Sequence, residues 1–131
     1  MPGMIRFIAA PFESVRLIAV TRSGTTVRYI HGPSEAVCLA AVRNDPYAIQ
    51  YIENPSETVQ LAAVEIQGYV LPYIRNPTKR VVITAFLTMF STGAVVYKIK
   101  ETEELLAKFT GNGYWSDLEI IRRSLADLKR R

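Results

Sequence analysis

Apolar residues recur at fixed intervals along most of the chain. Four prolines lie 22 residues apart, and the sequence after each one aligns without gaps over four units that span residues 11–98. The eighth position after the proline is always alanine, and the fourth and sixth are always aliphatic. These columns are Val15, Val37, Val59 and Val81; Leu17, Leu39, Leu61 and Ile83; and Ala19, Ala41, Ala63 and Ala85. Self-similarity at a fixed period of this length predicts a stack of like structural units.

The signals for a first helix are clearest in the unit that begins at Pro55. Asn54 is a good N-cap, Pro55 suits the first helical position, and Glu57 completes a capping box. The helix is therefore expected to start at Pro55 and to run for about three turns, to Ile66. Glu35 occupies the same position in the preceding unit. We interpret both glutamates as capping residues rather than as a pair of catalytic carboxylates.

A short second helix is predicted to follow the first in each unit. Gly68 offers a left-handed stop after the first helix, and Gly24 offers the same two units earlier. Pro46 is the corresponding helix breaker in the unit between them. Residues 69–74 then leave room for only one or two helical turns before the next Asn-Pro pair.

The first helix of each unit is apolar on nearly all sides, which suits a helix that is flanked by neighbours. A pair of helices of this length cannot bury such a surface alone, whereas stacked copies bury it on both sides. We therefore predict an all-α fold, a short α-solenoid of 22-residue two-helix repeats. Residues 1–10 would form an N-terminal half-repeat cap, residues 11–98 the four repeats, and residues 99–131 a helical C-terminal cap with a basic end.

The C-terminal cap is expected to contain two helices. Residues 100–108 read as the first, and residues 110–113 read as a turn. Ser116 and Glu119 form a capping box for the final helix, and Trp115 is predicted to seal the last repeat. The apolar stripe of this final helix consists of Leu118, Ile121, Leu125 and Leu128.

The run Tyr-Ile-x-Asn-Pro-Ser-Glu-x-Val-Gln-Leu-Ala-Ala-Val, residues 51–64, is echoed at residues 29–42 and 73–86. It resembles the short helical repeats of phage and bacterial proteins, which are distantly similar to HEAT repeats. The resemblance implies an interaction scaffold. It also implies a phage-encoded inhibitor of a host defence system, an anti-CRISPR being one example, which would act in the host cytoplasm on a bacterial defence or nucleic-acid-processing complex.

The net charge of +4 is concentrated in the second half of the chain. Residues 1–66 hold five Lys or Arg against six Asp or Glu, a net −1, whereas residues 67–131 hold eleven against six, a net +5. A basic flank can meet phosphates, so a nucleic-acid-binding accessory protein is the alternative function. The residues that would carry it are Arg75, Lys79, Arg80, Lys98, Lys100, Arg122 and Arg123.

Candidate catalytic chemistry is sparse. Cys38 is the single cysteine, which excludes an internal disulfide and favours a reducing compartment, so a cytoplasmic protein is predicted. The first six residues lack the basic region and apolar run of a secretory signal, so no export is expected. It has no basic neighbour that would make it a nucleophile. The single histidine, His31, lies at a variable corner between units and is interpreted as a surface residue. We expect no enzyme activity, no cofactor and no metal site.

The variable columns of the repeat are the candidate partner-binding positions. They include Arg28 and Gln50 on the second helices and Arg43 late in a first helix, while Tyr47 and Tyr69 begin second helices and are expected to be reachable. Three charged residues complete the set: Arg75, Lys79 and Arg80. Three further tyrosines recur every 22 residues, namely Tyr29, Tyr51 and Tyr73. Packing between units is the first interpretation of these tyrosines, and an aromatic binding strip is the second.

Residues 81–97 form the longest uncharged segment, at seventeen residues. This length is at the lower limit for a membrane span. Because the segment aligns with the other repeats and contains five Thr, Ser or Gly residues, we predict no transmembrane helix. Its additional apolar residues are expected to cover the terminal module or a contact between two copies of the chain.

Overall fold

The computed structural model describes residues 9–110 and 115–130, and every regular element within these ranges is helical. Six α-helices alternate in part with four short 3₁₀ helices, labelled η. In chain order they are α2 (Ala9–Arg22), η1 (Gly24–Tyr29), α3 (Glu35–Asn44), η2 (Pro46–Tyr51), α4 (Glu57–Ile66), η3 (Gly68–Tyr73), α5 (Lys79–Ser91), η4 (Ala94–Tyr97), α6 (Ile99–Thr110) and α7 (Trp115–Arg130). The prediction of an all-α fold is confirmed for this part of the chain. The predicted N-terminal cap lies mostly outside the described residues.

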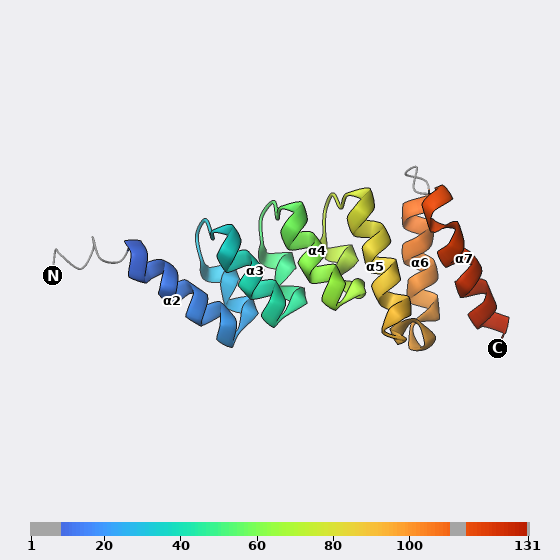
Figure 1. Ribbon diagram of the computed structural model, residues 1–131, viewed down its shortest axis with the longest axis horizontal. Helices are drawn as coiled ribbons and strands as arrows, with labels where there is room; N and C mark the ends of the chain where they lie inside the picture. The colour runs from blue at the N-terminus through green and yellow to red at the C-terminus, as the bar shows by residue number, and fades with distance from the viewer. Residues whose placement is uncertain (1–8, 111–114, 131) are drawn as a thin grey trace.

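The helices lie side by side along the long axis of the molecule, with α2 at one end of the row and α7 at the other (Figure 1). Helices α3, α4 and α5 begin 22 residues apart, and so do η1, η2 and η3. Each of α3 and α4 packs against the α-helix before it and the one after it, and η1, η2 and η3 each pack against the α-helix that follows. The predicted short second helices are therefore present, as 3₁₀ helices.

Repeated apolar columns form much of the core, and α6 and α7 add Leu105, Leu106, Phe109, Ile121 and Leu125 to it. In α3, α4 and α5 the valine and alanine of each unit are almost completely buried, namely Val37, Val59, Val81, Ala41, Ala63 and Ala85. The equivalent valine of α2, Val15, is 60% exposed, and α2 is the first of the described helices, so no described helix precedes it in the row. The contacts between neighbouring helices thus account for the apolarity of the inner helices.

The helices begin later than the sequence predicts. Helix α4 begins at Glu57, and its N-cap is Ser56, whose Oγ accepts a hydrogen bond from the backbone N–H of Val59 at 3.3 Å. Asn54 instead has a left-handed backbone with φ of 51°, which turns the chain before Pro55. The predicted start at Pro55 is wrong because the serine hydroxyl, not the asparagine amide, reaches the third N–H of the helix.

The glutamates at the helix starts do not form the predicted capping boxes. Glu35 Oε1 accepts a hydrogen bond from the Oγ of Ser56, the N-cap of the next helix, at 2.5 Å. Glu13 and Ser34 make the same contact one unit earlier, also at 2.5 Å. A glutamate at the first helical position cannot fold back onto its own cap. These carboxylates therefore connect the start of one helix to the cap of the next.

Gly24 and Gly68 allow close packing and are not left-handed stops. Neither has a positive φ among the described residues. A Cβ atom on Gly68 would lie 2.3 Å from the carbonyl oxygen of Ala85, and one on Gly24 would lie 2.3 Å from that of Ala41. Each glycine thus lets the start of a 3₁₀ helix touch the backbone of the next α-helix.

Side-chain caps set the junction between the two helices of a unit. Asp45 Oδ1 accepts a hydrogen bond from the backbone N–H of Tyr47 at 3.0 Å, and Gln67 Oε1 accepts one from that of Tyr69 at 3.2 Å. The next residue at this spacing is Met89, whose thioether is only a weak acceptor. The side-chain cap that follows α3 and α4 and starts the next 3₁₀ helix is therefore missing after α5.

Helix α5 consequently continues to Ser91, and Gly93, with φ of 77°, makes the turn into η4. Val95 lies 22 residues after Tyr73 in the sequence but, for this reason, does not end the 3₁₀ helix of its unit. Tyr97 ends η4 as Tyr73 ends η3.

Two features of the C-terminal region were predicted in part. Helix α6 covers the predicted helix at residues 100–108, and α7 begins at Trp115, one residue before the expected cap Ser116. The side chains of Trp115 and Ser116 lie outside the described residues, so the sealing role of the tryptophan stays a prediction. Within the described part of the chain, no helix combines the length and apolarity that a membrane crossing requires.

Candidate functional site

Tyrosines that end three successive 3₁₀ helices form an exposed aromatic face. Tyr29 is 74% exposed, Tyr51 39% and Tyr73 47%. We call these three residues the tyrosine face. Packing between units accounts for these rings only in part. The isoleucine after each tyrosine is the residue that packs inward, with Ile52 and Ile74 buried and Ile30 half-buried, while the Tyr73 ring contacts that of Tyr47 in the preceding unit.

Arg28 connects two members of the tyrosine face. Its guanidinium lies over the rings of both Tyr29 and Tyr51, at 4.6 Å and 5.4 Å from the ring centroids. It also donates a hydrogen bond to the hydroxyl of Tyr29, which raises the pKa of Arg28 above its usual value. The cation over these two exposed rings places a positive charge on the tyrosine face, beside Tyr29 and Tyr51.

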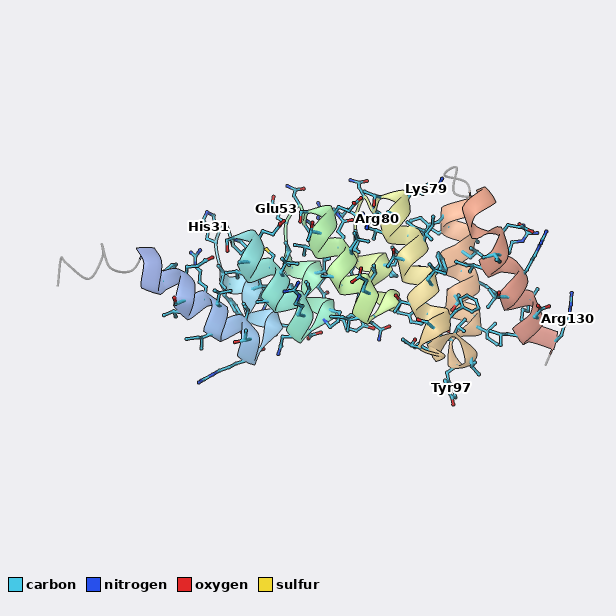
Figure 2. The ribbon with its side chains drawn as sticks, viewed as in Figure 1. His31, Glu53, Lys79, Arg80, Tyr97 and Arg130 are labelled. Atoms are coloured by element: carbon cyan, nitrogen blue, oxygen red, sulfur yellow. The ribbon has the colours of Figure 1, made fainter. Side chains whose placement is uncertain are left out.

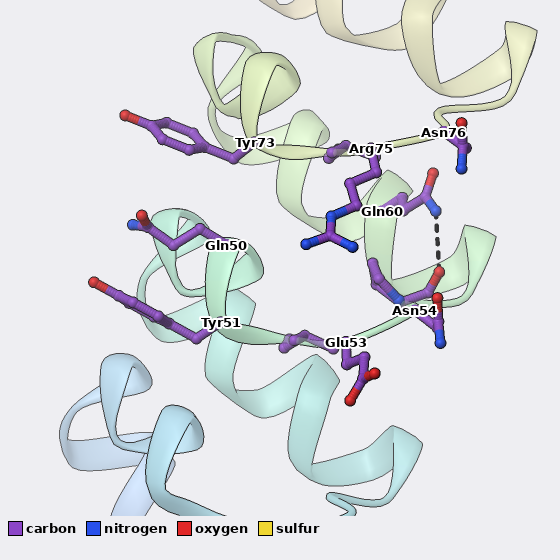
Figure 3. Close-up of a pocket in the computed structure, with 11 residues that line it drawn as sticks. Gln50, Tyr51, Glu53, Asn54, Gln60, Tyr73, Arg75 and Asn76 are labelled. Carbon is purple, nitrogen blue, oxygen red and sulfur yellow. Dashed lines mark hydrogen bonds between the residues drawn. The ribbon is translucent and has the colours of Figure 1, made fainter.

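Gln50 and Tyr47 lie next to the tyrosine face, as their predicted role requires. Gln50 is exposed, and its Nε2 donates to the backbone carbonyl of Tyr47 at 3.1 Å. The half-buried Tyr47 ring meets that of Tyr73 edge-on, with centroids 5.7 Å apart and an angle of 76° between planes. Figure 3 shows Gln50, Tyr51 and Tyr73 pointing to the same side.

Tyr69 is buried, so the prediction that it is reachable is wrong. Only 8% of the residue is exposed, because α6 covers it. Its Oη lies 2.5 Å from Thr102 Oγ1, and since Thr102 donates its own proton to the carbonyl of Lys98 at 2.7 Å, Tyr69 is the donor. Burial raises the pKa of Tyr69. The contact with Thr102 spans 33 residues, and the repeat pattern contains no signal for it.

A groove of about 540 Å³ lies between two connecting segments, residues 51–55 and 73–76. We call it the connector groove (Figure 3). Gln60, on α4, lines it and is 8% exposed, and the exposed Arg75 side chain points into it. The lining consists of Gln50, Tyr51, Ile52, Glu53, Asn54, Pro55, Gln60, Tyr73, Ile74, Arg75 and Asn76. Of these, only Gln50 and Arg75 belong to the predicted partner-binding set.

The basic residues are spread over the molecule. Lys79 and Arg80 lie at the start of α5, whereas Tyr97, the neighbour of Lys98, lies at the opposite end of that helix (Figure 2). Arg80 is 3.9 Å from Glu57, and Arg123 is 3.3 Å from Glu119. Exposed positions elsewhere hold Lys100, Arg122 and Arg43. The residues of the nucleic-acid alternative are thus not gathered on one face.

Chemically reactive groups do not converge within the described residues. Cys38 is buried, and burial raises the pKa of its thiol, which disfavours the reactive thiolate. His31 is exposed in the segment between η1 and α3. The described part of the chain contains no group of three or more His, Cys, Asp or Glu residues that could hold a metal ion.

Comparisons with family models, with curated proteins and with solved structures found no match to this chain.

Proposed function

We propose that this protein is a non-enzymatic protein-binding module built as a short α-solenoid. The 22-residue spacing of the helix starts, together with contacts between successive helices, supports the repeat architecture. In this proposal residues 11–98 are the repeats, closed at the C-terminal end by α6 and α7.

The observation that carries the proposal is the tyrosine face. Tyrosine and arginine are enriched among the residues that dominate binding energy in protein interfaces, because they combine a large contact area with a polar end. A tyrosine loses little conformational entropy when it is immobilised. Here Tyr29, Tyr51 and Arg28 present these groups together, on short helices whose backbones are fixed by the packing of the units.

The test is capture of a partner from bacterial lysate, with and without nuclease. We expect a protein partner that survives nuclease treatment, and we expect Tyr51→Ala and Tyr73→Ala each to weaken its binding by about 30-fold or more, as for interface residues of high energy. Glu65→Ala, an exposed change on α4 outside the tyrosine face, serves as the control. Loss of every partner on nuclease treatment, or binding that is indifferent to both tyrosine substitutions, would contradict the proposal.

The resemblance to phage proteins adds a narrower expectation, a host defence complex as the partner. This stays a prediction, and the identity of the captured protein tests it.

A further inference from the structure

The connector groove contains a polar atom without a partner. Gln60 Oε1 has almost no exposed surface and accepts no hydrogen bond among the described residues. The Gln60 Nε2 atom, in contrast, donates to the carbonyl of Pro55 at 3.0 Å. Figure 3 shows this amide lying between the two connecting segments. Buried carbonyl oxygens are normally hydrogen bonded, so the unpaired oxygen requires an explanation.

The fold itself does not need this oxygen. Cys38 and Val82 occupy the same position in the neighbouring units, and both are buried. The sulfur of Cys38 lies 3.9 Å from the carbonyl oxygen of Pro33. This contact is equivalent to the hydrogen bond that Gln60 Nε2 donates to Pro55. Neither Cys38 nor Val82 has a side-chain oxygen that corresponds to Gln60 Oε1. Among the described residues, Gln60 is therefore the one residue of this column with a buried unpaired acceptor; Arg16, two units earlier, instead has a buried unpaired donor, its Nε.

The remaining lining suits a polypeptide better than a polyanion. Three further primary amides line the groove, from Gln50, Asn54 and Asn76, and an amide can pair with both the N–H and the C=O of a peptide. The two charged residues of the lining, Glu53 and Arg75, have opposite signs. A chain of phosphates would be attracted by Arg75 but repelled by Glu53, so the lining does not favour a polyanion.

Arg75 is available to a ligand. Among the described residues it forms no hydrogen bond and no ion pair, and its guanidinium points into the groove (Figure 3). Guanidinium groups pair with carboxylates through two parallel hydrogen bonds. Because no hydrogen bond or ion pair among the described residues holds the Arg75 guanidinium, it is free to pair with an incoming carboxylate in the groove that Gln60 also lines.

We propose that the connector groove binds an extended peptide segment of a partner protein. A backbone N–H of the peptide donates to Gln60 Oε1, and an acidic side chain of the peptide pairs with Arg75. The rings of Tyr51 and Tyr73 border the groove and contact the peptide on either side. This inference rests on the proposed protein-binding function and specifies the chemistry of the partner.

The test uses a display library of random dodecapeptides, selected on the full-length chain, followed by affinity measurements on the selected peptides. We expect Gln60→Val and Arg75→Ala each to weaken binding about five- to tenfold, the loss typical of one hydrogen bond or exposed ion pair. Valine is tolerated at this position, as Val82 shows, so the Gln60 variant should fold. The matched controls are Cys38→Val, one unit earlier, and Arg22→Ala, an exposed arginine at the end of α2 outside the groove; both should bind as the unaltered chain does.

Methylation of single backbone nitrogens of the peptide locates the proposed hydrogen bond. One position should weaken binding to the unaltered chain but cause no further loss with Gln60→Val. The proposal that the connector groove binds a peptide would be overturned if no peptide could be selected, or if Gln60→Val left the affinity of the selected peptides unchanged. Random single-stranded oligonucleotides that displace the peptides and depend on Arg75 would overturn it as well.

The failure of this inference is distinguishable from failure of the proposed function. Suppose that a nuclease-resistant partner requires Tyr51 but binds the Gln60→Val and Arg75→Ala variants as tightly as the unaltered chain. This result would contradict peptide binding in the connector groove but would still support a protein-binding module.

Discussion

At the scale of single residues, backbone contacts explain positions that a hydrophobic pattern cannot. Gly24 and Gly68 follow the first helix, where a glycine ordinarily indicates a left-handed stop. They are instead the points at which one unit touches the backbone of the next. The sequence identifies both glycines as special, but only the packing of two units reveals the reason, because the atoms they contact lie 17 residues further along the chain.

Gly68→Ala is expected to lower the free energy of unfolding by about 2 kcal/mol or more, because the new Cβ would lie 2.3 Å from the Ala85 carbonyl oxygen and the two units would have to separate. Urea denaturation measures the change. Gly32→Asn is the control: Gly32 has φ of 59°, no atom lies within 4 Å of the place that a Cβ would occupy, and Asn54 holds the equivalent place at φ of 51°. Equal losses in the two variants would contradict this account.

The Tyr69 hydroxyl is expected to stabilise the packing of α6 on η3. Tyr69→Phe removes the hydrogen bond to Thr102 and should lower the free energy of unfolding by about 1 kcal/mol at neutral pH.

The same tyrosine predicts a dependence on pH. Burial raises the pKa of Tyr69 in the folded chain above its unfolded value of about 10, so folding favours the protonated phenol. Its contribution is complete below the unfolded pKa and is lost as the pH rises toward and through the folded pKa. Denaturation between about pH 9 and 11 should therefore show a steeper loss for the unaltered chain than for Tyr69→Phe. Parallel curves would rule out this role.

At the scale of the elements, the repeat period predicted which helices are present but located their ends poorly. The period of 22 placed the α-helices and the short second helices, since both depend on apolar spacing within one unit. The caps depend on which of several polar side chains reaches an N–H group, and there Ser56 rather than Asn54 is the N-cap. The groove at Gln60 could not be predicted, because two neighbouring units form it.

The carboxylate of Glu35 and the hydroxyl of Ser56 are expected to be energetically coupled across two units. Ser56→Ala should destabilise the chain by about 1 kcal/mol through loss of the N-cap, with a further effect from the carboxylate it leaves without a donor. In a double-mutant cycle with Glu35→Gln, the two changes should therefore not be additive. The pair Ser56→Ala and Glu65→Ala, which share no contact among the described residues, should be additive.

At the scale of the whole molecule, the row of helices separates basic residues that are concentrated in the second half of the sequence. The basic half of the sequence is not a basic face, because Lys79 and Arg80 lie at one end of α5 and Lys98 lies beyond the other. Several of the cations are also paired with carboxylates, as Lys129 is with Glu103 at 2.9 Å.

We accordingly expect only weak binding to mixed-sequence DNA, with a Kd of about 10⁻⁴ M or above at near-physiological salt, the upper end of non-specific affinities. Titrations at about 50 and 200 mM salt measure it. Micromolar binding at the higher salt that is abolished by Arg75→Gln with Arg80→Gln would instead support the nucleic-acid alternative.

The one-sided exposure of α2 has a consequence for the motions of the chain. The inner helices α3 and α4 are held from both sides, whereas among the described elements α2 packs mainly against α3 and η1. In a linear array, local opening begins where a unit has fewest neighbours. Amide hydrogens of α2 should therefore exchange with deuterium earlier than those of α4, and the order of protection should fall outward from the middle of the row.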